Sequence, residues 1–196
     1  MSEEHRETQE DRIYFFDKQE VIVEDFEAEG YFLDIGGGGE GIIGRLKGEQ
    51  VICIDPNRRE LEDAPPGTLK IVMDATDLKF LDETFATATS FFTLMYIDVH
   101  EHEEVFSEIF RVLKPGGRLL VWDAVVRPSV DHDKEIAAFP LSIRLPREQM
   151  ETGYGCPWPA EDHDLAYYLQ LAEDTGFEVG VRRQKDLLLI LELRKP

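Results

Sequence analysis

Cysteine is scarce in this sequence, and its cysteine and histidine residues lack the spacing of a metal-binding motif. The two cysteines, Cys53 and Cys156, lie far apart, and no Cys-x-x-Cys pair is present. This pattern excludes the common zinc-finger and dithiol redox motifs. His100 and Glu104 would share one face of a helix, but a metal site needs three or four converging groups, so we predict no metal site.

Long apolar runs are also missing. No stretch approaches the roughly 18 apolar residues that a membrane-spanning helix needs. Residues 1–12 (MSEEHRETQEDR) are charged throughout, unlike the apolar centre of a secretion signal. Together with the few cysteines, these absences predict a cytoplasmic protein without membrane association.

Positive charge is under-represented, with 21 Lys and Arg residues against 41 Asp and Glu, which gives a net charge of −20. Such a field repels nucleic acid phosphates and anionic lipid. We therefore predict no nucleic acid partner and favour neutral or cationic small molecules. A purely solubilising role for the acidity stays open, and so does the oligomeric state.

The stretch that organises the chain is residues 31–44, YFLDIGGGGEGIIG. It predicts a buried strand, a glycine turn and the start of a helix, the unit with which open α/β sheets build nucleotide pockets. No Gly-Lys-Ser/Thr follows, which excludes a P-loop. Gly36, Gly38 and Gly41 fit the G-x-G-x-x-G spacing of dinucleotide enzymes, and a turn without a ligand is a further reading.

Apolar runs after the loop alternate with helical patterns, as expected for a doubly wound α/β sheet. Asp55 and Asp74 follow two of these runs, where carboxylates accept hydrogen bonds from a nucleoside. Two closely connected final strands must be antiparallel. The predicted strands are 31–35, 50–55, 69–73, 85–92, 118–123, 177–182 and 187–193.

Two segments interrupt this rhythm. Residues 1–29 are predicted to form a helical leader, and residues 124–164 a proline-rich insertion too long for an ordinary crossover. The remaining chain, 30–196, is predicted to be one domain, with the insertion on its substrate side. Within the insertion, the aromatic residues predict either a wall over a substrate or a loop packed on itself. They are Tyr154, Trp158 and His163.

The ordered motifs resemble the class I S-adenosylmethionine-dependent methyltransferases over residues 30–193. The resemblance rests on Asp34-Ile35-Gly36-Gly37-Gly38, on Asp55, on Asp74-Ala75, on the Lys-Pro-Gly-Gly turn at 114–117 and on the terminal hairpin. It implies a Rossmann-like three-layer sandwich with a mostly parallel seven-stranded sheet, order 3-2-1-4-5-7-6. In that order the seventh strand is antiparallel.

The resemblance also implies S-adenosylmethionine as cofactor. Its methionine part would lie on the glycine loop, with Asp34 orienting the amino group, Asp55 holding the ribose and Asp74 the adenine amine. Further residues implied to line the cofactor are Ile35, Pro56, Ala75, Ser90 and Phe91. One position departs from the family pattern, since Glu40 stands where a glycine is common.

The sequence thus predicts an enzyme that transfers a methyl group from S-adenosylmethionine to a small acceptor. Asp34, just before the glycines, would repel a pyrophosphate, so a nicotinamide-dependent oxidoreductase is the second choice. A non-catalytic S-adenosylmethionine-binding module is a third. Tyr96, Tyr154 and Trp158 are predicted to line the substrate pocket, and no catalytic residue is assigned, because orientation alone can carry much of such a reaction.

Overall fold

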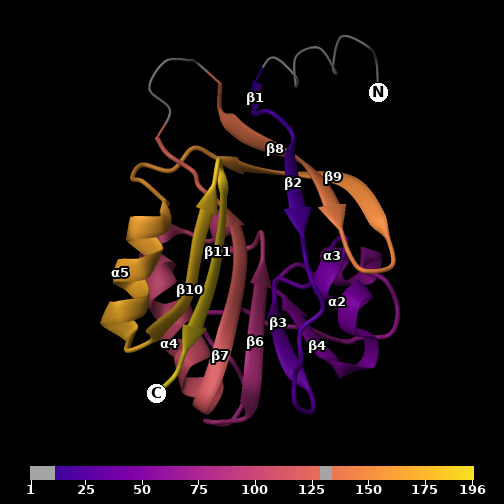
Figure 1. Ribbon diagram of the computed structural model, residues 1–196, viewed down its shortest axis with the longest axis vertical. Coiled ribbons are helices and arrows are strands. Elements are labelled where there is room, and N and C mark those ends of the chain that lie inside the picture. Colours follow the sequence, from indigo (N-terminus) through magenta and orange to yellow (C-terminus); the bar gives the residue numbers. More distant parts are fainter. Residues whose placement is uncertain (1–11, 129–133) are drawn as a thin grey trace.

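A computed structural model describes residues 12–128 and 134–196, which form two β-sheets with helices around the larger one (Figure 1). Residues 1–11 of the predicted leader and 129–133 of the predicted insertion lie outside the described residues. Within the described ranges, none of the helices is long and apolar enough to cross a membrane.

The large sheet has seven strands in the order β10-β11-β7-β6-β3-β4-β5. Strand β11 is antiparallel to both of its neighbours, and the other neighbouring pairs are parallel. Counted along the chain within this sheet, the order is 3-2-1-4-5-7-6, so the predicted topology is confirmed. The strands are β3 (Phe32–Ile35), β4 (Val51–Asp55), β5 (Leu69–Val72), β6 (Phe85–Phe91), β7 (Leu113–Ala124), β10 (Glu178–Lys185) and β11 (Leu188–Arg194).

Both faces of this sheet are covered, as the buried central strands require. Side chains alternate along a strand, so Leu33 and Ile35 of β3 enter one apolar cluster while Phe32 enters another. Figure 1 shows α4 and α5 on one side of the sheet and α2 and α3 on the other. The helices are α2 (Ile42–Lys47), α3 (Arg58–Asp63), α4 (His102–Val112) and α5 (Leu165–Thr175).

The Lys-Pro-Gly-Gly segment forms a break in the pairing between β6 and β7, at the start of β7. Helix α4 ends at Val112, and β7 pairs Leu113 with Phe85 but Arg118 with Thr87. Residues 114–117 therefore have no matching partners on β6, and Gly116 adopts a left-handed φ of 75°. The helix ends directly before this motif, and β7 begins at Leu113 without a separate loop.

The second sheet joins the two segments that interrupt the α/β rhythm, the leader and the insertion. Strands β1 (Ile13–Phe15) and β2 (Gln19–Ile22) pair in parallel with β8 (Ile136–Arg144), and β9 (Gln149–Pro157) pairs with β8 in antiparallel. The helical prediction for the leader is therefore wrong within residues 12–29.

The reason for this error is visible in the burial pattern. Val21 and Val23 are 1% exposed, whereas Ile22 between them is 48% exposed, which is the period of two of a strand. Its partner β8 comes from more than a hundred residues along the chain. Three consecutive β-branched residues favour a strand once such a partner is present.

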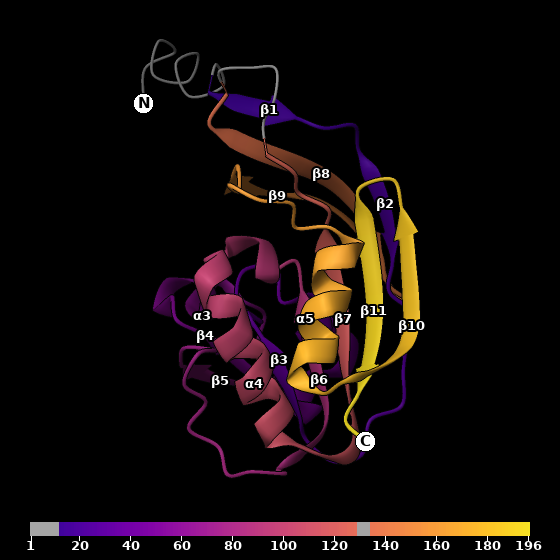
Figure 2. The ribbon, with the colours of Figure 1, turned by 90° about the vertical axis from the view of Figure 1, so that its left-hand side faces the viewer.

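Residues 136–157 of the insertion form a long β-hairpin rather than an irregular loop. Its strands β8 and β9 lie at the end of the large sheet where the parallel strands finish (Figures 1 and 2). The inner face of the hairpin, which includes Phe139 and Leu141, packs in the same apolar cluster as Phe32 of β3 and Ile42 of α2. The hairpin is thus anchored above the carboxyl ends of the parallel strands.

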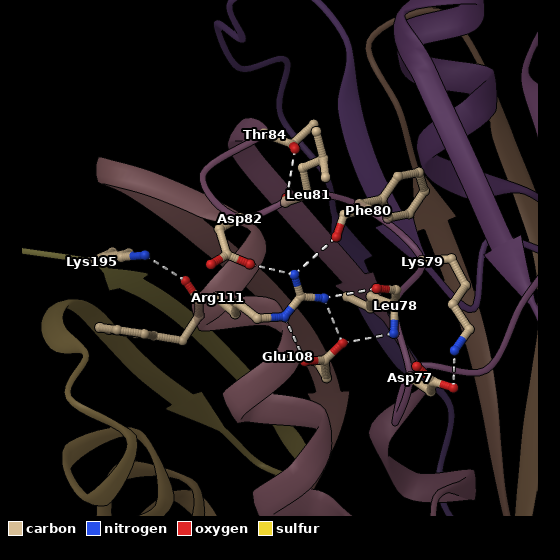
Figure 3. A network of polar contacts seen from close by, with 11 residues as sticks. Asp77, Leu78, Lys79, Phe80, Leu81, Asp82, Thr84, Glu108, Arg111 and Lys195 are labelled. Atoms are coloured by element: carbon tan, nitrogen blue, oxygen red, sulfur yellow. Dashed lines mark hydrogen bonds and ion pairs between the residues drawn. The ribbon is translucent and has the colours of Figure 1, made fainter.

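The connection from β5 to β6 is held by Arg111 of α4 (Figure 3). The guanidinium donates to Glu108 at 2.7 Å, to the carbonyl oxygens of Leu78 and Phe80 at 2.7 and 2.9 Å, and to Asp82 at 2.7 Å. Glu108 in turn accepts from the Leu78 amide at 2.8 Å. Arg111 therefore fixes the segment that follows Asp74.

Candidate functional site

A cavity of about 590 Å³ lies at the carboxyl ends of β3, β4, β5 and β6, under the β8–β9 hairpin. This volume is typical of small-molecule sites. Its lining combines the glycine loop, strand-end acids and aromatic side chains. Predicted site residues in the lining are Asp34, Ile35, Gly36, Gly37, Gly38, Asp55, Pro56, Asp74, Ala75, Phe91, Tyr96 and Tyr154.

The glycine loop is packed so closely that side chains are excluded from it. A Cβ on Gly38 would lie 2.5 Å from Glu60 Cβ and 2.8 Å from Asp55 Oδ2, and a Cβ on Gly36 would overlap the side chain of Thr93. Gly36 also has a left-handed φ of 67°, which glycine adopts at no steric cost. The loop therefore presents bare backbone to the cavity.

Asp34 lies beneath this loop and is only 2% exposed. Its carboxylate accepts a hydrogen bond from Thr89 Oγ1 at 2.7 Å, and Cys53 Sγ lies 4.0 Å from its second oxygen. Burial raises the pKa of Asp34 to about 7, although the Thr89 bond lowers it. A Cβ on Gly37 would lie 2.5 Å from Asp34 Oδ2, so Asp34 packs against the loop in addition to lining the cavity.

The other two strand-end acids are more open. Asp55 accepts from the Asn57 amide at 2.8 Å, and partial burial raises its pKa. Asp74 accepts from the amide and the hydroxyl of Thr76 at 2.9 and 2.8 Å. Each carboxylate is oriented by its own turn, and each keeps oxygen lone pairs for a ligand in the cavity.

At the end of β6 the structure separates two neighbours that the sequence grouped together. Phe91 lines the cavity, but Ser90 is fully buried and outside its lining. The next residue, Phe92, has a left-handed φ of 49°, which is unusual for an aromatic residue and marks a strained turn. Phe92 also lines the cavity, and its ring stacks on Tyr154 at 5.1 Å between centroids.

The hairpin supplies one wall of the cavity. The amide of Gly155 on β9 donates to Tyr96 Oη at 3.1 Å. Burial raises the pKa of Tyr96 to about 12, so the phenol keeps its proton at neutral pH. Because Tyr96 Oη accepts this amide hydrogen bond, its own O–H is left to donate, which suits it to orient a ligand better than to act as a base.

Two predicted aromatic residues of the insertion lie elsewhere. Trp158 is outside the cavity lining and packs edge-on against Tyr14 and Phe16 of the leader, at 5.9 Å between centroids in both pairs. His163 stacks on Tyr167 of α5 and is 5% exposed. Of the three predicted aromatics, only Tyr154 reaches the cavity, because the leader and α5 provide apolar partners for the others.

Sequence reasoning missed several lining residues, among them Glu40, Asn57, Glu60, Thr93, Glu101 and Gly153. Glu40 was noticed only as an exception to a glycine pattern. Glu60 and Glu101 belong to a short helix and a 3₁₀ turn (Val99–Glu101) that looked like solvated surface. The one signal in the sequence for these missed residues is their position shortly after a strand end, where ligands bind in open α/β sheets.

The lining is strongly electronegative. Its acidic residues are Asp34, Glu40, Asp55, Glu60, Asp74 and Glu101, and the described lining contains no lysine, arginine or histidine. Carboxylates gathered around one cavity repel one another, and a cation inside it relieves this repulsion. The site therefore favours a ligand with positive charge and no phosphate.

Comparisons with known proteins point to a methyltransferase domain. A family model described as a methyltransferase domain matches residues 33–121. A sterol methyltransferase-like protein of Botryococcus braunii is 28% identical over 162 residues, which are 76% of this chain and 38% of that protein. A sterol 4-C-methyltransferase of Caenorhabditis elegans is 32% identical over 117 residues, 53% of this chain and 34% of that protein.

The chain thus spans between one third and two fifths of the length of these relatives. Among solved structures, an S-adenosylmethionine-dependent methyltransferase from Methanosarcina mazei superposes with a TM-score of 0.61. It is 20% identical, and the match covers 87% of this chain and 94% of that one. At this identity the likeness concerns the fold alone.

Proposed function

The chain belongs to the class I S-adenosylmethionine-dependent methyltransferase family, and we propose that it transfers a methyl group from S-adenosylmethionine to a small neutral or cationic acceptor. The reacting domain comprises residues 30–196, with residues 124–164 on the acceptor side. Tyr154 of that insertion lines the cavity, which supports the assignment.

The residues present fit this cofactor. The bare backbone of Gly36, Gly37 and Gly38 would hold its methionine part, Asp55 its ribose hydroxyls and Asp74 its adenine amine. The turns that follow orient both carboxylates. S-adenosylmethionine supplies a methyl group that its sulfonium has already activated, so the chain needs mainly to orient the acceptor and exclude water.

The observation that carries the proposal is the charge of the cavity, in which six acids line the walls and the described lining offers no cationic side chain. S-adenosylmethionine brings a sulfonium, an ammonium and one carboxylate, so its net charge is positive, and it has no phosphate. A nicotinamide dinucleotide would bring a pyrophosphate into the same negative field, which disfavours the oxidoreductase alternative.

The residues that line the cavity also indicate the class of acceptor. Without a cationic side chain, a carboxylate or phosphate acceptor has no partner in the described lining. Apolar groups such as Ile97, Val105 and Tyr154 suit a neutral apolar body. One relative is named a sterol 4-C-methyltransferase and another a sterol methyltransferase-like protein, so neutral sterols are the first acceptors to assay. The acidic lining adds primary amines to this panel.

Calorimetric titration tests the cofactor assignment. S-adenosylmethionine and S-adenosylhomocysteine should bind, and NAD⁺ and NADP⁺ should not. Asp55→Ala should weaken binding at least about tenfold, as expected for loss of a hydrogen bond from a charged group. Unchanged affinity in this variant, or preferential binding of a dinucleotide, would refute the assignment.

Turnover then separates an enzyme from a binding module. Transfer of labelled methyl from S-adenosylmethionine to an acceptor panel of sterols, amines and phenols should yield product with at least one neutral or cationic compound. Cofactor binding without transfer to any member of the panel would favour the non-catalytic module instead.

A further inference from the structure

Glu40, the residue that departs from the family's glycine pattern, connects the glycine loop to the β8–β9 hairpin. Thr152 Oγ1 of β9 donates to Glu40 Oε1 at 2.6 Å. Gly39 and Gly41 on either side both have a left-handed φ of 57°. The glycines therefore make the turns of the loop, and the residue between them carries the side chain that reaches β9.

This contact is stronger than the link that Arg45 makes between the loop region and the hairpin. Arg45 of α2 donates to the Glu40 carbonyl at 2.7 Å and lies 3.4 Å from Glu148 in the hairpin turn. Both members of that ion pair are partly exposed, with side-chain exposures of 32% and 41%, so its contribution is small. A short hydrogen bond to a carboxylate is worth more.

The link determines where the acceptor wall lies. Thr152 is followed directly by Gly153 and Tyr154, which line the cavity, and Tyr154 stacks on Phe92. Burial, and then the negative charge of Glu40, raise the pKa of Tyr154. Glu40 therefore interacts with the hydroxyl groups of both Thr152 and Tyr154 on β9.

Glu40 also faces the cofactor side of the cavity. It lines the same cavity as Asp34, Asp55 and Asp74, and its side chain accepts a hydrogen bond from the neutral hydroxyl of Thr152 rather than from a cation. A bound cation would reduce the repulsion among these acids and draw the walls together. The loop that holds the cofactor thus carries the residue that holds the hairpin.

We propose that Glu40 is a positioning residue that fastens β9 over the cavity, and that the positive charge of bound S-adenosylmethionine strengthens this fastening. The acceptor wall is then held more firmly in the loaded protein than in the free protein. The second half of this inference rests on the proposed function, whereas the first half concerns the free protein and does not.

Hydrogen exchange of the full chain, followed by mass spectrometry for residues 149–157, tests both halves. In the free protein, Glu40→Gln and Thr152→Val should each speed exchange in this segment about tenfold, which corresponds to about 1.4 kcal/mol. Thr152→Ser keeps the hydroxyl and should retain the wild-type rate. Glu60→Gln removes a charge from the same cavity without touching the hairpin and should leave the rate within about twofold.

Adding S-adenosylmethionine should slow exchange of residues 149–157 further in the wild type and in Glu60→Gln, and much less in Glu40→Gln. S-adenosylhomocysteine, which lacks the positive charge of the sulfonium, should slow it less than S-adenosylmethionine does. Equal exchange in free wild type, Glu40→Gln and Thr152→Val would overturn the fastening role. Equal slowing by the two ligands, or equal slowing in Glu40→Gln, would overturn the role of cofactor charge.

These results are distinguishable from a failure of the proposed function. If calorimetry shows that S-adenosylmethionine does not bind, the function falls, and with it the charge-dependent half of the inference. The comparison of free wild type, Thr152→Val and Thr152→Ser still decides whether Glu40 fastens β9.

Discussion

Replacing Arg111 by methionine should destabilise the protein through the connection between β5 and β6. The guanidinium lies between α4 and this connection, with a side-chain exposure of 31% (Figure 3). Methionine keeps most of the apolar stem but removes every hydrogen bond. The carbonyl oxygens of Leu78 and Phe80 and the carboxylate of Glu108 would lose their charged partner.

The expected loss is about 3 kcal/mol, because each of the two carbonyl bonds to a charged donor contributes roughly 1.5 kcal/mol. The bond to Asp82 adds little, since that carboxylate is 74% exposed. For a chain of this length, 1 kcal/mol shifts the melting temperature by roughly 2–4 °C. Arg111→Met should therefore melt about 6–12 °C below the wild type.

Urea unfolding at pH 7 measures this loss, with Lys79→Met as the matched control. Lys79 pairs with Asp77 on the same connection, but both side chains are about two-thirds exposed, 67% and 65%, so this variant should lose less than about 0.5 kcal/mol. If Arg111→Met also stays within about 0.5 kcal/mol of the wild type, the network in Figure 3 does not hold the connection, and the reasoning is refuted.

Three further outcomes are expected. The free energy of unfolding should fall as pH rises from about 4 to 7, and Asp34 should contribute at most about 1.4 kcal/mol per pH unit to this fall. The reason is that native Asp34 keeps its proton up to a pKa of about 7, while the unfolded chain releases it near 3.8. Asp34→Asn should flatten the slope of stability against pH in urea titrations, and equal slopes in the variant and the wild type would contradict this reasoning. Gly36→Ala should destabilise the protein and weaken S-adenosylmethionine binding more than Gly30→Ala, since both glycines have a φ above 60° but only Gly36 faces Thr93; equal losses in both assays would show that backbone strain alone matters. Ser90→Ala should leave cofactor affinity unchanged and gain up to about 1 kcal/mol in stability, because the buried hydroxyl has no hydrogen-bond partner among the described residues. A loss of cofactor affinity in calorimetry would instead support the contact between Ser90 and the cofactor that the sequence predicted.

The positions of the core strands could be predicted because each strand is a local signal, whereas their order in the sheet was implied by the resemblance to the methyltransferase family. Short apolar runs mark buried parallel strands, and the close connection between the last two marks an antiparallel pair. The places of Asp55 and Asp74 at strand ends follow from the same signals, because parallel strands bring their carboxyl ends to one edge of the sheet.

The leader and the insertion could not be predicted in this way, because each depends on the other. Strands β1 and β2 exist as partners of β8, and pairing over such a distance leaves no mark in a local window. For the same reason Trp158 was assigned to the cavity, although it packs against Tyr14 and Phe16 of the leader.

The sequence by itself thus determined the α/β core, the bare glycine loop and the acids at the ends of β4 and β5, because hydrophobic period and glycine conformation act over a few neighbouring residues. Tertiary structure alone decided that a hairpin covers the cavity, that Tyr154 rather than Trp158 lines it, and that Glu40 reaches Thr152. These contacts join residues that lie about a hundred positions apart, and only packing of the complete chain brings them together.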